Sequence, residues 1–368
     1  MKKLKKEVFY VLFVGLVFCG LTLSCWLRPS DDFSATERRE LAKFPELSWK
    51  TIQSGLFMDK FEDYTLDQFP LREEFRTVKA FTHKYIFGQA DNNKVYLVGD
   101  HISKLEYPYS EKALDKTINK FTRIYDSYLK GTDAKVYTAL IPDKNYFLAE
   151  QNGYLAMDYD KLYETYTEGL SDIMTYIEIK DLLTIEDYYY TDTHWKQDCI
   201  VDVAQKLASA MGTTLNAEYE KVTMDSPFYG VYYGQLALPV NPDKITYLNN
   251  PLFDDCYVFN HENQKEIPVY DLDRVTGRDP YETFLSGSLS VITIENPNAT
   301  TDKELVIFRD SFGSSISPLF VEGYKKITIL DARYLAHDSV IGNFVEFTNQ
   351  DVLFLHCTSV VNNESAFK

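Results

Sequence analysis

The chain has 368 residues, of which 45% are hydrophobic and 25% are charged. This composition is typical of a globular protein, and it excludes a mostly disordered chain, a collagen-like repeat and a small disulfide-bonded domain. The formal net charge of −17 argues against a nucleic-acid partner, because binding phosphates requires a basic surface. The length indicates roughly two domains, or one large α/β domain with insertions.

The N-terminus carries a lysine-rich cluster at residues 2–6, followed by twenty uncharged, mostly apolar residues at 8–27. A helix of that length spans about 30 Å, which matches the hydrocarbon core of a bilayer. The lysines are expected to stay cytoplasmic, which places the rest of the chain outside. A cleavable signal peptide is the alternative, but residues 28–32 offer no typical cleavage site. We therefore expect a cytoplasmic tip and a single-pass cell-membrane anchor at 1–27, with an extracytoplasmic main domain.

Residues 28–90 are polar and helix-prone, with interruptions at Pro29, Pro45 and Pro70, and we interpret them as a stalk and a helical N-terminal region. An α/β domain is expected at 91–368. Its first part contains, in chain order, a predicted strand at 95–98, a helix at 113–130, a strand at 135–141, a helix at about 158–175 and a strand at 176–179.

The clearest predicted helix follows Asp192, because apolar residues recur at helical spacing from Ile200 to Met211 and Gly212 stands just past its end. Residues 213–300 are rich in Tyr, Pro, Asn and Gly, and we interpret them as a loop- and β-rich insertion. The C-terminal part alternates again, with strands predicted at 305–308, 327–330 and 352–356 and helices at 313–321 and 339–347. This alternation predicts a mostly parallel sheet covered by helices on both faces.

The five cysteines follow no metal-binding spacing, and the sequence contains no zinc-protease, phosphate-loop or dinucleotide-binding motif. Three of them, Cys199, Cys256 and Cys357, lie far apart beyond the anchor. They are expected to be buried free thiols, with a single disulfide as the alternative. We expect neither a metal nor a cofactor.

Two short segments combine chemically active residues with a strand-to-helix junction: residues 191–195 (TDTHW) and residues 309–313 (RDSFG). In α/β sheets, such junctions face the crevice where ligands bind. Ser311 would hold its hydroxyl and its own backbone N–H at one point. The dipole of the helix predicted after it favours negative charge at that point, as in one half of an oxyanion hole.

A serine hydroxyl is a weak nucleophile unless a base accepts its proton. His194 is placed at the start of the predicted helix, where the helix dipole disfavours imidazolium and keeps the ring available as a base. Asp192 lies two residues earlier and projects to the same side in an extended segment. Its carboxylate would bind Nδ1–H of His194 and leave Nε2 for Ser311. Asp192, His194 and Ser311 are therefore the predicted catalytic residues.

The sequence resembles the DHHW family of bacterial cell-surface proteins and, more distantly, is similar to the SGNH-like acetyltransferases of alginate O-acetylation. The resemblance lies in residues 29–48 (PSDDFSATERRELAKFPELS), VYLVGD at 95–100, IPDK at 141–144, YTDTHW at 190–195, LVIFRDSFG at 305–313 and ILDAR at 329–333. It covers nearly the whole chain beyond the anchor. It implies an SGNH-like three-layer α/β/α fold in which Asp192, His194 and Ser311 form a catalytic triad.

Two positions depart from the family pattern. Thr193 stands where the motif that names the family has His, at a position outside the triad. Arg309 stands where many SGNH enzymes have Gly, and no G-x-N-D block is evident. The remaining donors of the oxyanion hole are therefore unassigned.

Further side chains are candidates for contact with a substrate. Asn145 follows a predicted strand and is a candidate oxyanion donor, with a polar turn residue as the alternative. Tyr232, Tyr233 and Gln235 lie in a Tyr- and Gly-rich run suited to a sugar site, with core packing as the alternative. Arg309 is the remaining candidate for contact with a substrate.

Each catalytic segment also has a structural interpretation, because Asp192 and Ser311 can simply cap the helices that follow them. A metal site at Asp192 and His194 would lack a third ligand. The occurrence of both segments at junctions favours catalysis. We expect an extracytoplasmic O-acetyltransferase or acetylesterase that acts on a cell-envelope polysaccharide, with a membrane acyl-transfer protein as a candidate partner. The alternative is a non-catalytic surface protein that binds a glycan or a partner on the same scaffold.

Overall fold

The computed structural model describes residues 2–335 and 337–367. The chain divides into two compact units. The N-terminal unit comprises the chain up to Asn93 together with Tyr233–Pro239, and the sheet unit comprises Lys94–Tyr232 together with the chain from Val240 onward. A short piece of the predicted insertion therefore belongs to the N-terminal unit.

The N-terminal unit begins with α1 (Lys2–Leu27), which between Lys6 and Cys25 is long and apolar enough to cross a membrane. This helix fits either a single-pass anchor or a signal sequence. The other elements of the unit are short: β1 (Phe33–Ser34), β2 (Arg39–Glu40), α2 (Trp49–Gln53), α3 (Leu56–Asp67), α4 (Arg72–Phe81) and the π-helical turn η1 (Thr82–Ile86).

Local hydrogen bonds explain where these short elements begin and how they are joined. A capping box starts α2, in which the Ser48 hydroxyl accepts from the Thr51 N–H at 3.2 Å and Thr51 Oγ1 accepts from the Ser48 N–H at 3.1 Å. At the end of α3, the Asp67 carboxylate accepts from the Arg39 guanidinium and from the Ala42 N–H. The hydrogen bond from Arg39 lowers the pKa of Asp67.

The sheet unit is built on an eight-stranded sheet with the order β10-β9-β11-β13-β12-β14-β5-β6. Its strands are β5 (Lys135–Ile141), β6 (Thr175–Tyr176), β9 (Tyr257–Asn260), β10 (Lys265–Glu266), β11 (Val291–Glu295), β12 (Glu304–Arg309), β13 (Lys326–Leu330) and β14 (Asp351–Cys357). The strands from β13 to β6 pair in parallel, and β11, β9 and β10 extend the sheet antiparallel. The predicted α/β class with a mostly parallel sheet is confirmed.

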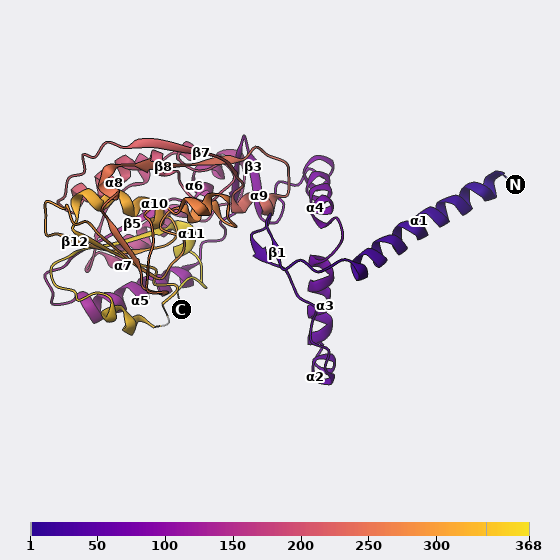
Figure 1. Ribbon diagram of the computed structural model, residues 1–368, viewed down its shortest axis with the longest axis horizontal. Helices are drawn as coiled ribbons and strands as arrows, with labels where there is room; N and C mark the ends of the chain where they lie inside the picture. Colours follow the sequence, from indigo (N-terminus) through magenta and orange to yellow (C-terminus); the bar gives the residue numbers. More distant parts are fainter. Residues whose placement is uncertain (1, 336, 368) are drawn as a thin grey trace. The chain divides into compact units, whose positions relative to one another are not determined.

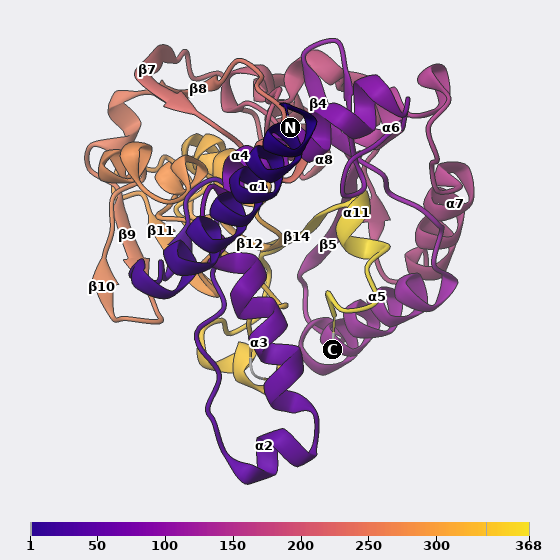
Figure 2. The ribbon, with the colours of Figure 1, turned by 90° about the vertical axis from the view of Figure 1, so that its right-hand side faces the viewer.

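Helices cover both faces of the sheet. The helices that do so are α8 (Val201–Ala210), α10 (Gly313–Ile316) and η10 (Ser317–Gly323) on one face, and α5 (Glu111–Ile124) and α7 (Tyr159–Leu170) on the other. Figure 1 shows α8 on one side of β5 and α7 and α5 on the other, and Figure 2 shows α5 and α7 next to each other.

The side-chain alternation of the strands produces these layers. In β12, Leu305 and Ile307 belong to the core beneath α8, whereas Val306 and Phe308 belong to the core beneath α5 and α7. Strands that are buried on both faces are apolar throughout, which is why the run at 305–308 was predicted as a strand.

The remaining elements of the sheet unit surround this core. They include β3 (Val95–Val98) paired with β4 (His101–Lys104), β7 (Glu220–Phe228) paired with β8 (Asp243–Asn249), α6 (Lys144–Leu148) and α11 (Thr358–Val361). The α-helix predicted at 339–347 is instead the short 3₁₀ helix η11 (Asp338–Asn343). Gly342 and Asn343 have low α-helix propensity, which explains why no α-helix extends through them to residue 347.

Candidate active site

The carboxyl ends of three neighbouring parallel strands meet at one edge of the sheet. β5, β14 and β12 run side by side in parallel, so the residues after Ile141, Cys357 and Arg309 lie together. Asp143 and Thr358 join two of these ends, since the Thr358 hydroxyl donates to the Asp143 carboxylate at 2.7 Å. Ser311 follows the third end by two residues. This edge is where ligands bind in open α/β sheets.

The segment that carries Asp192 and His194 is a tight reversal of the chain. The backbone of Tyr188 pairs with that of Trp195, and the Tyr189 N–H donates to the His194 carbonyl at 3.0 Å. The placement of His194 at a helix start was wrong. A 3₁₀ turn, η6 (Gln197–Cys199), intervenes, and α8 begins only at Val201. His194 therefore does not stand at the N-terminus of α8.

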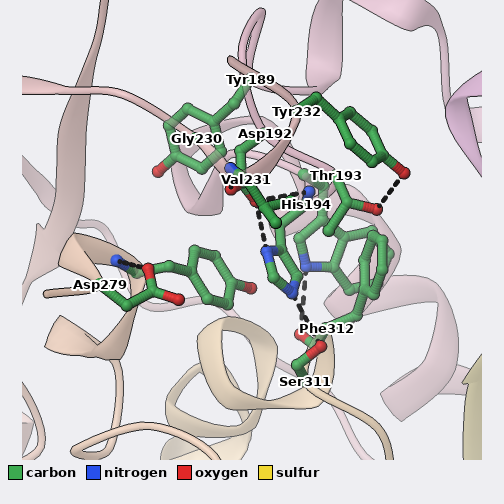
Figure 3. A network of polar contacts seen from close by, with 12 residues as sticks. Tyr189, Asp192, Thr193, His194, Gly230, Val231, Tyr232, Asp279, Ser311 and Phe312 are labelled. Carbon is green, nitrogen blue, oxygen red and sulfur yellow. Dashed lines mark hydrogen bonds and ion pairs between the residues drawn. The ribbon is translucent and has the colours of Figure 1, made fainter. Parts of the chain in front are cut away.

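The structure brings the three predicted catalytic side chains into one line of contacts. His194 Nδ1 lies 2.6 Å from Asp192 Oδ1, and His194 Nε2 lies 2.8 Å from Ser311 Oγ. Figure 3 shows Asp192 and Ser311 at opposite edges of the imidazole. Asp192 and His194 are buried, whereas Ser311 is partly exposed. A hydroxyl in this position can lose its proton to the ring while remaining open to a substrate.

Backbone groups hold the Asp192 carboxylate in its orientation. Oδ2 accepts from the Val231 N–H at 2.8 Å, and Oδ1 accepts from the His194 N–H at 3.1 Å. The approach of residues 230–231 requires a glycine, because a Cβ on Gly230 would lie 2.4 Å from the Asp192 Cα and backbone N. Figure 3 shows Gly230 and Val231 against Asp192. The carboxylate is thus fixed as an orienting group for the imidazole.

An aromatic residue that the sequence did not single out lies against the imidazole. The Tyr281 ring stacks on the His194 ring, with centroids 3.7 Å apart and an interplanar angle of 6°. Its hydroxyl donates to Ser315 Oγ at 2.9 Å. Ser315 Oγ also accepts a hydrogen bond from the Trp195 indole N–H at 2.9 Å. Tyr281 comes from the 3₁₀ turn η9 (Pro280–Thr283), far from the other site residues in sequence.

A buried lysine holds the turn that precedes His194. Lys144 Nζ donates to the carbonyls of Tyr189, Tyr190 and Asp192 at 2.7, 3.0 and 3.0 Å. Burial lowers the pKa of Lys144 to about 7, against the opposing influence of nearby carboxylates such as Asp243. Lys144 belongs to the IPDK run that contributes to the family resemblance, but no pattern in the residues around it indicates this role.

The hydrogen bonds around Ser311 restrict which donors can bind an oxyanion. The Phe312 N–H donates to Asp310 Oδ1 and the Gly313 N–H donates to the Asp310 carbonyl, each at 3.0 Å. Asp310 also accepts from the Cys357 N–H at 2.6 Å, and its burial raises its pKa. Within the described residues, the Ser311 N–H has no partner. It is therefore the candidate backbone donor to an oxyanion beside Ser311 Oγ.

Two predicted substrate-binding residues are buried and form hydrogen bonds within the protein. Asn145 is buried, and its side chain accepts from the Tyr96 hydroxyl at 2.8 Å and donates to the Leu155 carbonyl at 3.3 Å. Arg309 is completely buried, and its guanidinium lies 3.5 Å from the Asp331 carboxylate. Because neither side chain reaches the surface in this arrangement, we do not retain them as substrate contacts.

The Tyr-rich run is divided between the two units. Tyr232 is buried in the sheet unit and donates its hydroxyl hydrogen to Thr193 Oγ1 at 3.0 Å, next to His194 (Figure 3). Tyr233 and Gln235 belong to the N-terminal unit. Tyr232 is thus the member of the run that the structure brings beside the predicted catalytic residues.

The described residues contain no group of three or more His, Cys, Asp or Glu side chains that is arranged to hold a metal ion. All five cysteines are free thiols in the structure, but of the three that were expected to be buried only Cys357 is, whereas Cys199 and Cys256 are partly exposed.

No protein-family model matches the sequence, and no curated protein matches it. A DHHW family protein from Eubacterium siraeum matches the structure with a TM-score of 0.57 and 19% identity, over 75% of this chain and 94% of that one. Bacillus cereus PatB1 with a sulfonyl adduct matches with a TM-score of 0.58 and 16% identity, over 74% of this chain and 98% of that one.

A weaker match is the O-acetyltransferase domain of Pseudomonas putida AlgJ, with a TM-score of 0.43 and 13% identity, over 73% of this chain and 92% of that one. The structure neighbours thus include a protein of the family that the sequence resembles. The two stronger matches show that this chain shares its α/β fold with a DHHW family protein and with PatB1.

Proposed function

We propose that this chain is a membrane-anchored, extracytoplasmic SGNH-like serine enzyme that transfers acetyl groups to, or removes them from, a cell-envelope polysaccharide. One observation carries the proposal: the continuous contacts from Asp192 through His194 to Ser311, at 2.6 and 2.8 Å. Such an arrangement lets an imidazole accept a hydroxyl proton while a carboxylate fixes its tautomer. The resemblance to the enzymes of alginate O-acetylation supports acetyl as the acyl group.

In the first half-reaction, Ser311 Oγ attacks the carbonyl carbon of an acetyl ester, and its proton passes to His194 Nε2. The Asp192 carboxylate and the π face of Tyr281 both favour the resulting imidazolium. The Ser311 N–H binds the oxyanion, and one donor of this kind contributes ~10²–10³ in rate. The ester C–O bond then breaks, and the departing alcohol takes the proton from Nε2, which leaves an acetyl group on Ser311.

In the second half-reaction, a hydroxyl group attacks the acetyl carbon and gives its proton to His194 Nε2. The bond to Ser311 Oγ breaks, and the proton returns to that oxygen. Water as the attacking group makes the enzyme an esterase, and a sugar hydroxyl makes it a transferase.

Helix α1 supports the proposed location. As an uncleaved anchor with its lysine-rich end in the cytoplasm, it would hold the sheet unit at the outer face of the membrane, where envelope polysaccharides lie. A membrane protein that delivers acetyl groups is the partner we propose for the transferase version.

The test of this function is turnover of a small acetyl ester, p-nitrophenyl acetate, by the full chain. We expect Ser311→Ala to abolish hydrolysis, and Ser359→Ala, a serine just past the end of the neighbouring strand β14, to retain it. Circular dichroism checks that both variants fold. Turnover that persists in the folded Ser311→Ala variant would exclude this mechanism.

A second function, a non-catalytic glycan-binding protein, is favoured by one observation. The Phe312 and Gly313 N–H groups are already engaged by Asp310, so fewer donors are open to an oxyanion than in a complete hole. Saturable binding of an acetylated oligosaccharide by a wild-type chain that shows no turnover would favour this function.

A further inference from the structure

The N-terminal unit exposes an unusual concentration of apolar side chains. Among the described residues, fourteen large hydrophobic side chains are exposed within residues 44–87, compared with seven in residues 94–367. The most exposed include Leu47, Trp49, Ile86 and Phe87, each at 67% or more. Exposed apolar side chains that are concentrated in one segment mark it as a candidate interaction site. We call the segment at 44–87, which contains α2, α3, α4 and η1, the juxtamembrane segment.

Helix α4 is amphipathic in the opposite sense to a helix of a soluble protein. Two of its charged side chains are shielded: Arg72 and Arg76 form ion pairs with Glu37 at 2.6 and 3.2 Å and are less than 20% exposed, whereas Glu74 and Lys79 are exposed. Its apolar face is the open one, since Phe75 and Val78 are 48% and 61% exposed. A helix in water buries its apolar stripe instead. The exposed face of α4 therefore suits an apolar environment.

The juxtamembrane segment adjoins the end of α1. A cavity of about 590 Å³ is lined both by Phe18 and Leu21 of α1 and by Phe61 of α3. Phe44 packs edge-on against Phe61 at 5.9 Å and against Tyr64 at 5.3 Å. Tyrosine and tryptophan are enriched where a membrane meets water, and Tyr64 belongs to this cluster. This cluster stands beside the C-terminal half of α1, at the level where the span ends.

The charge of the segment differs from that of the sheet unit. Residues 94–368 carry 42 acidic and 24 basic residues, whereas residues 44–87 carry seven acidic and six basic residues. The sheet unit is repelled by anionic lipid headgroups, and the juxtamembrane segment is not. We propose that the occupant of its apolar surface is the lipid bilayer, and that α2, α3 and α4 lie in the outer lipid–water interface beside α1. This rests on the proposed role of α1 as an anchor.

The test uses the full chain in lipid nanodiscs of phosphatidylcholine and phosphatidylglycerol, in a Trp26→Phe background. Trp49 is 74% exposed and reports on the segment, while Trp195 is buried in the sheet unit and gives a constant signal. Nitroxide-labelled lipids quench tryptophan at the depth of their label. Interfacial helices insert roughly 5–10 Å below the headgroups. We expect a shallow label to remove most of the Trp49 emission and a label near the bilayer centre to remove little.

The matched control is a Tyr257→Trp reporter in a chain that also carries Trp49→Phe, since Tyr257 is an exposed aromatic residue of the sheet unit at 43%. We expect it to remain unquenched. Three results would overturn the proposal. A chain that fails to co-elute with nanodiscs would refute the anchor and the interfacial placement together. Co-elution with Trp49 unquenched would refute the placement alone. Protection of Trp49 from the nitroxide-labelled lipids in discs that hold two chains, but not in discs that hold one, would assign the surface to a second copy.

Discussion

The Tyr281 ring lies flat against the His194 imidazole, with centroids 3.7 Å apart and an interplanar angle of 6°. The ring is itself fixed, because its hydroxyl contacts Ser315 Oγ. In the proposed mechanism His194 becomes cationic in the transition state, so the stacked ring stabilises the transition state more than the resting state. Tyr281 is therefore a positioning residue for His194.

Two substitutions of Tyr281 distinguish the contribution of its ring to kcat from that of its hydroxyl. Loss of a cation–π contact of about 0.5–2 kcal/mol predicts that Tyr281→Leu lowers kcat by roughly two- to thirty-fold. KM should change little, because the Tyr281 ring is buried against His194. Tyr281→Phe keeps the stack and should retain most of kcat. Steady-state kinetics with p-nitrophenyl acetate provides the measurement, and equal losses in the two variants would assign the effect to the hydroxyl or to misfolding.

Removing the charge of Asp192 should impair the base without removing the nucleophile. Asp192→Asn is expected to lower kcat by about 10²–10⁴-fold, because the amide can present a donor to Nδ1 and favour the wrong tautomer. Asp198→Asn, in a carboxylate outside the site, is the control. Activity of Asp192→Asn near that of the wild type would show that the carboxylate does not orient His194.

The close approach at Gly230 predicts a steric effect on the same carboxylate. In Gly230→Ala, the new Cβ would meet the Asp192 backbone at 2.4 Å, so one of the two segments must move. We expect kcat to fall by at least ten-fold, since displacement of positioning groups by about 1 Å can cost 10²-fold. Gly342→Ala is the matched control, because its Cβ meets only the Tyr128 ring, at 3.3 Å. Comparable kinetics in the two variants would contradict the steric account.

His356 predicts a pH dependence of stability. It is fully buried on β14, 4.9 Å from the Phe121 ring, and burial lowers its pKa from 6.5 to about 3. Between these pH values the unfolded chain binds the proton and the folded chain does not, so this contribution to stability is lost as the pH falls below about 6.5. Urea unfolding of wild type and His356→Phe at pH 7.5 and pH 5 measures the difference. We expect the variant to lose less stability at pH 5, whereas the exposed-site control His337→Phe should behave as the wild type.

The core of the sheet unit could be predicted because its signals are local. The apolar runs of β5, β12, β13 and β14 bury both faces, and such runs read as strands without any knowledge of their partners. The nearness of Asp192 and His194 follows from their separation by two residues. The placement of Ser311 at the ligand-binding edge of the sheet follows from the rule that strand ends in parallel sheets share one edge.

Other parts of the site depend on packing that no local pattern encodes. Tyr281 is one of 28 tyrosines and sits in a short turn, so nothing in its neighbourhood distinguishes it. Lys144 can donate hydrogen bonds to the carbonyls of the turn at 189–192 only because that turn packs against its side chain in the folded protein. The start of α8 was misplaced because the apolar spacing extends to Ile200, whereas the backbone before Val201 forms a 3₁₀ turn.

The most direct test of the proposed chemistry is covalent labelling of the full chain with a sulfonyl fluoride, followed by mass spectrometry of its peptides. This probe is chosen because PatB1, which shares the fold, has been seen with a sulfonyl adduct. We predict one sulfonyl group on Ser311 in the wild type and its loss in the folded His194→Ala variant, where no base activates the hydroxyl. A folded wild-type chain that stays unlabelled at Ser311, or that is labelled equally without His194, would contradict the proposed catalytic triad.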